Sequence, residues 1–552
     1  MRKIVECVPN FSEGRDLSII EKITDEIKKV NDVVLLDVDP GKDTNRTVVT
    51  FAGTPEAVED AAFLAIKRAS ELIDMSKHSG AHPRMGATDV CPFIPVANIT
   101  MEECAEISRK LAKRVAEELK IPMYLYEEAA ATEERKSLAW IREGEYEALP
   151  EKLKQEKYRP DFGEPVFNAK AGATVTGARE FLIAYNVNLN TKSVKIANKI
   201  AKRIREAGRM VKNKETGEKE RVPGTLKAVR AVGWYIDEYE MAQISVNLLN
   251  YKTTPLYRVF EEAERFANEF GVRVTGSELV GLIPKDAIVA VGRRFLEKQD
   301  VSTGVSEKEI IRIAAHSLGL NEVSEFNPEH KIIEYRFKKP GKLASMNLIE
   351  FADELASDSP APGGGSVAAL NGSLSAGLSA MVGNLTYGKK AYKKVRKEMI
   401  EMSEKGQALK EFFVEAIDKD TDAFNLIMDA FALPKKTDEE KKIRDQAIQD
   451  ATKEATLIPF TVLEKCKEAA EFALIAAEKG NQNSLSDSGV AGLTASAAAE
   501  GALYNVMINL EGIEDEAFKK DLTQKAAAIF KEVEEIVAKV KALMYKELKI
   551  EL

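Results

Sequence analysis

The amino-acid sequence predicts two successive α/β subdomains followed by an all-helical bundle domain. Strand-like apolar runs alternate with amphipathic helical patterns over roughly the first 326 residues, and such alternation is typical of layered α/β domains. Beyond residue 347 the chain becomes rich in alanine, keeps helical periodicity and shows hardly any strand pattern, which predicts a bundle. We therefore expect a first subdomain at 1–180, a second at 181–326, a linker at 327–346 and a helical domain at 347–552.

Composition narrows the class of protein. The 552 residues are 44% hydrophobic and 31% charged, as in ordinary globular chains of several domains. A formal net charge of −9 and the absence of an overwhelmingly basic block argue against a nucleic-acid partner. The four cysteines are scattered and form no CxxC pair, so we expect reduced thiols. No apolar run has the length of a signal peptide or a membrane span, and we expect a cytoplasmic protein without a membrane partner.

Strands of the first subdomain are expected at 4–8, 33–39, 46–52, 90–96 and 123–126. The continuous apolar run at the start of 33–39 is typical of a fully buried strand. Pro92 and Pro95 cannot donate ladder hydrogen bonds, so we expect strand 90–96 to be short, irregular or at a sheet edge. In the second subdomain, strands are expected at 181–190, 229–238 and 242–250. The apolar stretch 272–284 follows, and the run 332–337 (IIEYRF) predicts one short strand in the linker.

Helix starts are marked by capping residues. A first helix is expected from about residue 17, and Thr54 followed by proline opens a second. Thr100 and Glu103 form a capping box that opens a third, ending near residue 119. In the second subdomain we expect helices from Thr191, between residues 255 and 271, and before Gly319.

The loop at 77–95 (KHSGAHPRMGATDVCPFIP) is the first candidate for chemistry. It places His78 and His82 on a glycine-rich segment that leads into a strand, where a histidine is well positioned for proton transfer. On residue type alone, a histidine that only forms hydrogen bonds within a turn is the more common case. The spacing of four suits a metal only on a helix, no glutamate lies between the histidines and no third one is near, so we expect no metal. Asp37 and Asp39 end a neighbouring strand and share a face by alternation, which permits a paired role.

Other stretches leave two interpretations open. The glycine-rich segment 158–177 either wraps a flat ligand or only connects the α/β units, and the basic segment 202–230 is more often a solvated surface than a polyanion site. In the helical domain, PAPGGGS (360–366) before a helix of small residues either binds a polar group or allows close helix packing. Asp418, Asp420 and Asp422 lie on one predicted helix and are either surface carboxylates or include an acid–base group.

Taken together, these stretches resemble the formimidoyltransferase-cyclodeaminase family over nearly the whole chain. CVPNFSEGRD, LLDVDPGKDTNRTVVTFAG, HSGAHPRMGATDVCPFIP, YRPDFG, GATVTGAREFLIAYNVNL and GSELVGLIP are similar to its transferase half. PAPGGGSVAAL, DKDTDAFNLIMDAFALPK and DSGVAGLTASAAAEGALYNVMINL are similar to its cyclodeaminase half. The resemblance implies transfer of a formimidoyl group from N-formimidoyl-L-glutamate to N5 of tetrahydrofolate, then cyclisation to 5,10-methenyltetrahydrofolate with release of ammonia, as part of histidine degradation.

The resemblance also implies residue roles. His82 falls on the family's proton-shuttling histidine and Asp39 on a carboxylate at the bottom of the transferase site. For cyclisation we choose Asp420 over Asp422 as the catalytic aspartate. The family's folate-contacting segment falls on Gly163, Glu164, Pro165, Val166, Phe167, Asn168, Ala169, Lys170, Ala171 and Gly172.

Partners follow from the same resemblance. Tetrahydrofolate is a co-substrate, no metal or redox cofactor is required, and the helical domain dimerises, so a homo-oligomer is expected. Two alternatives stay open for the helical domain. It either catalyses another folate cyclisation or hydrolysis, or it serves as a non-catalytic folate-binding or oligomerisation module.

Overall fold

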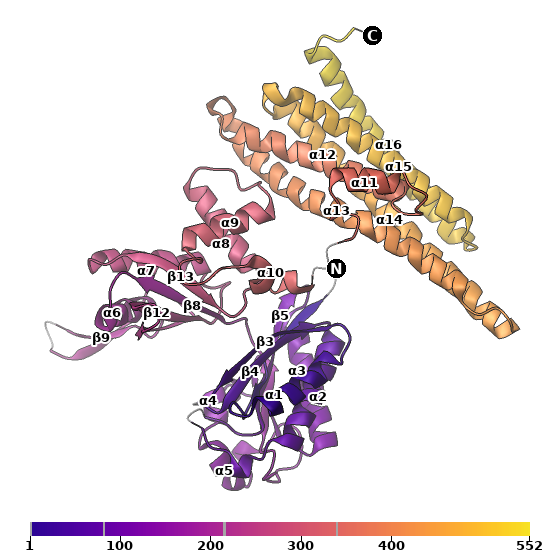
Figure 1. The fold of residues 1–552 in the computed structure, drawn as a ribbon. Coiled ribbons are helices and arrows are strands. Elements are labelled where there is room, and N and C mark those ends of the chain that lie inside the picture. The colour runs from indigo at the N-terminus through magenta and orange to yellow at the C-terminus, as the bar shows by residue number, and fades with distance from the viewer. Residues whose placement is uncertain (1–2, 43, 81–82, 214–216, 338–340, 552) are drawn as a thin grey trace. The chain divides into compact units, whose positions relative to one another are not determined.

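The computed structural model describes residues 3–551 except 43, 81–82, 214–216 and 338–340. The chain divides into two compact units, one formed by residues 1–291 and 315–338 and the other by residues 292–314 and 339–552 (Figure 1). The first unit holds the sheets and the second consists of helices, which confirms the predicted succession of α/β and all-helical parts. All four cysteines are buried free thiols. No helix among the described residues is long and apolar enough to cross a membrane.

A seven-stranded sheet organises the first α/β subdomain. Its order is β1-β4-β2-β5-β7-β6, with β3 paired to β4, and β5 and β6 run parallel to β7 while the other pairs are antiparallel. The strands are β1 (Ile4–Cys7), β2 (Asn10–Phe11), β3 (Val33–Gly41), β4 (Arg46–Gly53), β5 (Thr88–Ala97), β6 (Met123–Glu127) and β7 (Thr174–Ala178).

Helices cover both faces of this sheet. One face packs against α1 (Leu17–Lys28), α2 (Pro55–Leu72) and α3 (Met101–Leu119), which bury their apolar sides in one common core (Figure 1). Part of the other face packs against α4 (Leu138–Ile141) and α5 (Glu145–Lys152), which enclose a smaller core. The rest of this second face carries Asn10 of β2, Asp37 and Asp39 of β3, and Arg46, Val48 and Thr50 of β4, and we call it the open face.

One strand prediction for this subdomain was wrong, and of the three alternatives for strand 90–96 (short, irregular or at an edge) only the irregular one was confirmed. β3 is a half-exposed edge strand and not a fully buried one, because only β4 pairs with it. β5 is ten residues long and central, bonded to β1 and β2 on one side and β7 on the other. Its Pro92 lies between the part of β5 that pairs with β2 and the part that pairs with β1, and Pro95 lies at a register irregularity opposite β1. The prolines therefore fall where the ladder is already interrupted.

Helix starts follow the capping signals closely. The Thr100 hydroxyl accepts a hydrogen bond from the Glu103 backbone N–H, and the Glu103 carboxylate accepts one from the Thr100 backbone N–H, so the predicted capping box is present at α3. Thr54 precedes α2 with Pro55 at its first position, although the Thr54 side chain makes no capping bond. The helix expected from Thr191 begins three residues later, where Ser193 caps it.

The second α/β subdomain contains a four-stranded antiparallel sheet of order β11-β12-β8-β13. Its strands are β8 (Ile183–Leu189), β11 (Val229–Ile236), β12 (Met241–Leu248) and β13 (Val274–Val280), and a separate exposed hairpin is formed by β9 (Arg209–Lys212) and β10 (Lys219–Val222). Its helices are α6 (Val194–Ile204), α7 (Leu256–Glu269) and α10 (Pro328–Lys331), while α8 (Lys285–Lys298) and α9 (Glu307–Leu318) each begin in one of the two units and end in the other. The strand expected at 332–337 was wrong: Ile332 forms one isolated bridge with Ile283, and a short 3-10 helix, η4 (Glu334–Phe337), follows.

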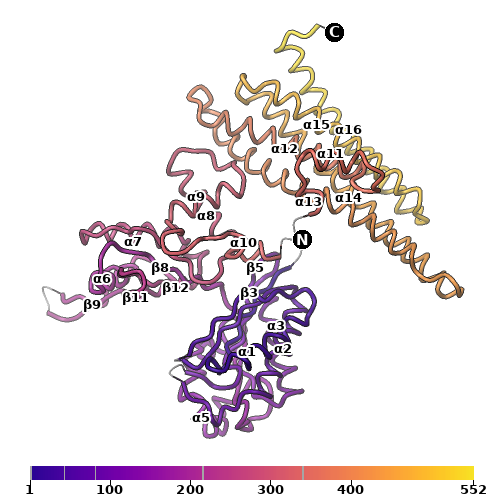
Figure 2. Tube along the Cα trace, in the orientation of Figure 1, coloured from indigo at the N-terminus to yellow at the C-terminus, as the bar shows by residue number. Residues whose placement is uncertain are grey.

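Helices packed through small side chains form the second unit after residue 339. They are the short α11 (Leu348–Leu355) and the long α12 (Gly364–Tyr387), α13 (Arg396–Ala432), α14 (Asp438–Lys479), α15 (Leu485–Glu511) and α16 (Glu516–Glu547). α12 lies close to α13: a Cβ added to Gly372 would lie 2.6 Å from the Phe413 ring. The α13–α14 hairpin reaches beyond the other helices of the unit (Figure 2).

Candidate active sites

Hydrogen bonds hold the histidine loop in place on both sides of its central residues, 79–83. His78 follows the short 3-10 helix η1 (Met75–Lys77), and its Nε2 lies 2.9 Å from the carbonyl oxygen of Asn45. Arg84 Nε donates to His78 Nδ1 over 3.2 Å. Because a carbonyl only accepts and a guanidinium only donates, His78 is the neutral tautomer with its proton on Nε2. His78 therefore holds the loop in place, while His82 lies outside the described residues.

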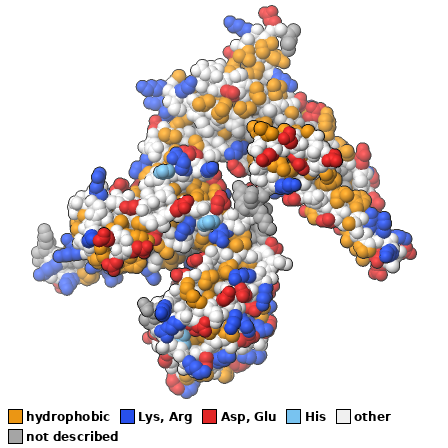
Figure 3. Space-filling model, in the orientation of Figure 1, with side chains coloured by type: hydrophobic (Ala, Val, Ile, Leu, Met, Phe, Trp, Pro, Cys, Tyr) orange, Lys and Arg blue, Asp and Glu red, His pale blue; other side chains and the backbone are white. Residues whose placement is uncertain are grey.

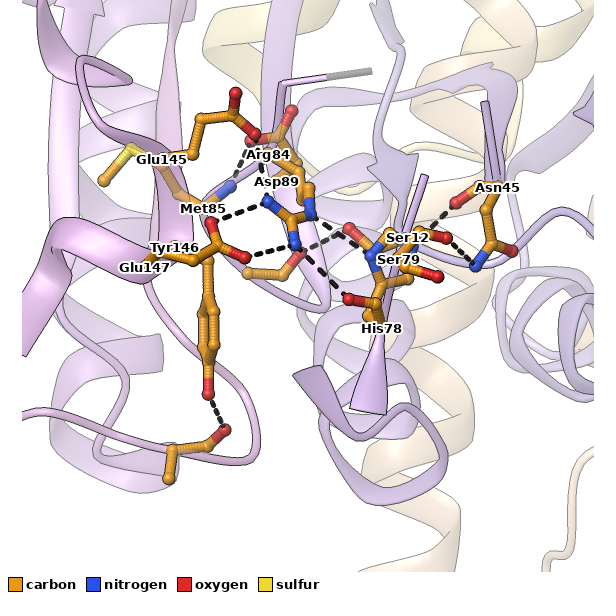
Figure 4. A network of polar contacts seen from close by, with 12 residues as sticks. Ser12, Asn45, His78, Ser79, Arg84, Met85, Asp89, Glu145, Tyr146 and Glu147 are labelled. Atoms are coloured by element: carbon orange, nitrogen blue, oxygen red, sulfur yellow. Dashed lines mark hydrogen bonds and ion pairs between the residues drawn. The ribbon is translucent and has the colours of Figure 1, made fainter. Parts of the chain in front are cut away.

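Arg84 connects this loop to α5. Its guanidinium forms ion pairs with Glu145 at 3.0 Å and Glu147 at 2.7 Å, and its Nη2 donates to the His78 carbonyl oxygen over 3.3 Å (Figure 4). The hydrogen bond with Glu147 raises the pKa of Arg84, and the same bond lowers the pKa of the Glu147 carboxyl. The backbone on either side of residues 79–83 is thus fixed by charged groups.

Asp39 lies on the open face. It is opposite Val48 in the β3–β4 ladder, while Asp37 is opposite Thr50, so the two carboxylates share that face as alternation predicts. Both are exposed.

Glu6 is a buried carboxyl that sequence reasoning missed. It is only 3% exposed, and burial raises its pKa to about 8, assisted by the charge of Glu334 and opposed by that of Arg179. The available signal was a single carboxylate inside the apolar run IVECV. Glu6 is therefore mainly protonated at neutral pH.

The segment 163–172 borders a cavity and then joins the histidine loop. The cavity has a volume of about 700 Å³. It is lined from the segment by Gly163, Glu164, Val166, Phe167, Asn168 and Ala169, and from α3 and its surroundings by Lys113, Ala116, Glu117, Lys120 and Phe162. Pro165, Lys170, Ala171 and Gly172 do not line it.

Beyond the cavity the segment pairs with the end of the histidine loop. The Ala87 N–H donates to the Ala171 carbonyl oxygen over 2.9 Å, and Gly172 bridges Gly86. Gly172 has a φ of +67°, and a Cβ there would lie 2.2 Å from the Met85 carbonyl oxygen, so glycine is required. The structure thereby brings the predicted folate-contacting segment to the predicted catalytic loop.

In the helical unit, Asp420 lies beneath the N-terminus of α12. A Cβ added to Gly365 would lie 2.1 Å from Asp420 Oδ1, and Asp420 Oδ2 lies 3.5 Å from the Ser366 hydroxyl. Burial raises the pKa of Asp420, while hydrogen bonds from Ser366 act in the opposite direction. The glycine-rich stretch therefore leaves room for a carboxyl that retains its proton to a higher pH than a solvated one.

The other two aspartates of this helix have different surroundings. Asp418 accepts hydrogen bonds from the backbone N–H groups of Leu343 at 2.8 Å and Ala344 at 2.9 Å, so it anchors the segment that leads into α11. Asp422 is exposed. Of the three, Asp420 alone combines a partly buried carboxyl whose pKa is raised with a neighbouring helix N-terminus.

Comparison with known proteins covers both units. Family models match at residues 4–179 (formiminotransferase domain, N-terminal subdomain), 184–338 (formiminotransferase domain) and 347–528 (formiminotransferase-cyclodeaminase). A formimidoyltransferase-cyclodeaminase of Dictyostelium discoideum is 44% identical over 545 residues, 98% of each chain.

Two relatives match only one part of the chain each. A glutamate formimidoyltransferase of Streptococcus pyogenes serotype M1 is 44% identical over 300 residues, 54% of this chain and 95% of its own. A methenyltetrahydrofolate cyclohydrolase of Methylorubrum extorquens is 42% identical over 202 residues, 36% of this chain and 94% of its own.

Proposed function

Since the chain belongs to the formimidoyltransferase-cyclodeaminase family, we propose that it is a bifunctional folate enzyme. It transfers the formimidoyl group of N-formimidoyl-L-glutamate to N5 of tetrahydrofolate and then closes the ring to 5,10-methenyltetrahydrofolate with loss of ammonia. The observation that carries this proposal is the match along 98% of a bifunctional relative. The transferase comprises residues 1–180 and 181–326 and the cyclodeaminase residues 347–552, joined by 327–346. We assign the pathway to histidine degradation in the cytoplasm.

His82 is the proposed proton shuttle of the transfer step. N5 attacks the amidine carbon and loses a proton, and the glutamate nitrogen must gain a proton to leave. One imidazole can accept the first proton and deliver the second near neutral pH. The fixed positions of His78 and Arg84 support this role, because they restrain the loop on both sides of His82. Asp39 is proposed to stabilise the positive charge that develops on the amidine.

The segment from Gly163 to Gly172 is the proposed folate-binding element. Its first residues line the cavity of about 700 Å³, a size that suits a small ligand. Glu117 and Glu164 also line the cavity, and Glu117 lies 3.9 Å from Lys113, so Lys120 is the proposed partner of a folate carboxylate. Tetrahydrofolate enters as a co-substrate, and neither proposed step requires a metal.

Asp420 is the proposed acid and base of cyclisation. N10 attacks the amidine carbon, after which the amino group must leave in a protonated form. A carboxyl whose pKa is raised by burial can carry that proton. Asp422 is the second candidate, and its exposure makes it the weaker one.

We also propose that the helical domain forms a homo-oligomer. On α12, Leu374 is 50% exposed and Leu385 is 48% exposed, and on α15, Leu493 is 51% exposed and Ile508 is 65% exposed. Figure 3 shows hydrophobic side chains on the visible surface of the helical unit. Runs of exposed apolar residues on neighbouring helices are typical of protein–protein contacts.

Product analysis of the purified full-length chain tests both steps. Formimidoyl-glutamate and tetrahydrofolate are supplied, and glutamate, ammonia and methenyltetrahydrofolate absorbance are followed together. We expect His82→Ala to stop glutamate release. Asp420→Asn should release glutamate but accumulate formimidoyl-tetrahydrofolate, whereas Asp422→Asn should behave like the wild type.

Two results would contradict the proposal that the helical domain is a cyclodeaminase. Release of glutamate without ammonia by the wild type would make it a folate-binding or assembly module. Hydrolysis of supplied methenyltetrahydrofolate, without ammonia release from formimidoyl-tetrahydrofolate, would make it a cyclohydrolase. The similarity to the cyclohydrolase of Methylorubrum extorquens favours this second candidate.

A further inference from the structure

Two buried polar atoms on the open face have no hydrogen-bond partner among the described residues. They are Oδ1 of Asn10 in β2 and Nε of Arg46 in β4. Asn10 is 4% exposed, and its Nδ2 donates to the Val8 carbonyl oxygen over 2.9 Å, so the amide orientation is fixed and Oδ1 is the free acceptor. The pair consists of one donor and one acceptor.

The ladder places these two side chains next to each other. Asn10 is opposite Val48, and Arg46 precedes Val48 by two residues, so both project from the same face as diagonal neighbours. Asp39 is also opposite Val48, from the β3 side. The proposed catalytic carboxylate and the two unpartnered atoms therefore share one patch of the sheet.

The guanidinium of Arg46 lacks a dedicated counter-ion among the described residues. Burial lowers the pKa of Arg46, the charges of Asp89 and Asp39 raise it, and the charge of Arg142 lowers it. The buried Asp89 carboxylate is already paired with two nitrogens of Arg142. The pKa of Arg46 is lowered on balance, so these carboxylates do not fully offset the burial of the cation in the free protein, and an anionic ligand would relieve that cost.

The residue before Arg46 is part of the histidine loop's anchorage. Asn45 donates from Nδ2 to the Ser79 carbonyl oxygen over 3.0 Å, and its own carbonyl oxygen meets His78 Nε2. Gly80 packs directly on this segment, because a Cβ there would lie 2.2 Å from the Thr44 carbonyl oxygen. Arg46 is thus one residue away from the backbone that holds the proposed catalytic loop.

We propose that Arg46 and Asn10 recognise the amino-acid part of the formimidoyl donor. Arg46 binds a carboxylate of formimidoyl-glutamate, and Asn10 Oδ1 accepts a hydrogen bond from the substituted N–H on the adjacent α-carbon. This carboxylate and this N–H are separated by a single carbon, which matches a neighbouring donor and acceptor. The assignment rests on the proposed transfer function and names the donor-specific part of that site.

The glutamate tail of folate offers the same carboxylate chemistry, so the test must separate the two substrates. We compare full-length wild type, Arg46→Met, Arg46→Lys and the control Arg68→Met. Arg68 in α2 also has a buried Nε without a partner among the described residues, but its Nη1 pairs with Glu71 at 2.8 Å, away from the open face. Kinetics are measured with each substrate varied in turn, and thermal unfolding is measured with and without L-glutamate.

We expect Arg46→Met to raise the KM for formimidoyl-glutamate about 30-fold, the equivalent of about 2 kcal/mol for a charge-assisted hydrogen bond. The KM for tetrahydrofolate should stay within about twofold, since only the donor carboxylate is lost. Arg46→Lys should recover part of the loss, and Arg68→Met should match the wild type. L-glutamate should raise the Tm of the wild type but not of Arg46→Met, and the ligand-free Tm of Arg46→Met should not fall.

Three results would overturn the proposal. A lower ligand-free Tm with an unchanged donor KM would make Arg46 a structural residue. A rise in the KM for tetrahydrofolate alone would assign Arg46 to the folate tail. Absence of an L-glutamate effect on the wild-type Tm would show that Arg46 does not form a carboxylate-binding site. If the wild type shows no transfer but Arg46→Met abolishes its L-glutamate shift, the proposed function fails while the carboxylate site stands.

Discussion

Replacing Glu6 with glutamine should remove a pH-dependent loss of stability in the first unit. Glu6 is 3% exposed and its pKa is about 8 in the folded chain, against an ordinary value of 4.5. A folded-state pKa above the unfolded one means that the protonated carboxyl favours folding. That contribution is complete below pH 4.5 and is lost as the pH rises through 8. Between pH 6 and pH 8 the free energy of unfolding should fall by about 2 kcal/mol from this group alone.

Glutamine keeps the shape of the protonated carboxyl but cannot ionise. We expect Glu6→Gln to unfold with nearly the wild-type free energy at pH 5 and to exceed it clearly at pH 8. Tryptophan fluorescence during urea unfolding reports on this unit selectively, because the chain's two tryptophans, Trp140 and Trp234, both lie in it. Glu21→Gln is the matched control, since Glu21 is exposed on α1. Equal pH dependence of Glu6→Gln and wild type would refute the claim that burial holds this proton.

Three further predictions concern other parts of the chain. Gly365→Ala should reduce ammonia release at least tenfold and leave glutamate release within about twofold, as measured by product analysis. The reason is that the new Cβ would lie 2.1 Å from the present position of Asp420 Oδ1 and would displace this carboxylate. Equal loss of both products would contradict this prediction. Arg84→Met should lower the free energy of unfolding in urea by about 2 kcal/mol and the rate of formimidoyl transfer at least tenfold, since three partners lose their donor. An unchanged rate would show that the anchoring of the loop by Arg84 does not matter for catalysis. Leu493→Glu should reduce the oligomeric state in sedimentation velocity, because it places a charge in an exposed apolar run, and an unchanged sedimentation coefficient would exclude that face.

Local signals in the sequence were sufficient for most of the elements. The capping box of Thr100 and Glu103 predicted the start of α3 correctly, because its two hydrogen bonds form between residues three apart. The alternating run at 46–52 likewise predicted β4. These features depend on neighbours along the chain, so a single sequence contains the information.

Pairing between distant strands was beyond such reasoning. The prolines of β5 predicted a strand that is short, irregular or at an edge. The strand is irregular, but it is ten residues long and central, with Pro92 between the segments bonded to β2 and β1. The apolar residues of strand 33–39 predicted a buried strand, but β3 has a neighbouring strand on one side only. Asn10 and Arg46 lie in two stretches that resemble the family, CVPNFSEGRD and LLDVDPGKDTNRTVVTFAG, but neither was singled out, and only the β2–β4 register brings them together. Site residues of this kind depend on tertiary contacts between segments about 35 residues apart.

The three aspartates of α13 show how helix geometry separates identical residues. Successive residues of an α-helix are rotated by about 100°, so Asp420 projects roughly opposite to Asp418, which faces the backbone at Leu343. Only one of these carboxylates can therefore reach the N-terminus of α12. If cyclisation occurs there, a single carboxyl must take the proton from N10 and return it to the departing nitrogen. Burial favours this double use, because it brings the protonated and ionised forms of Asp420 closer in free energy at neutral pH.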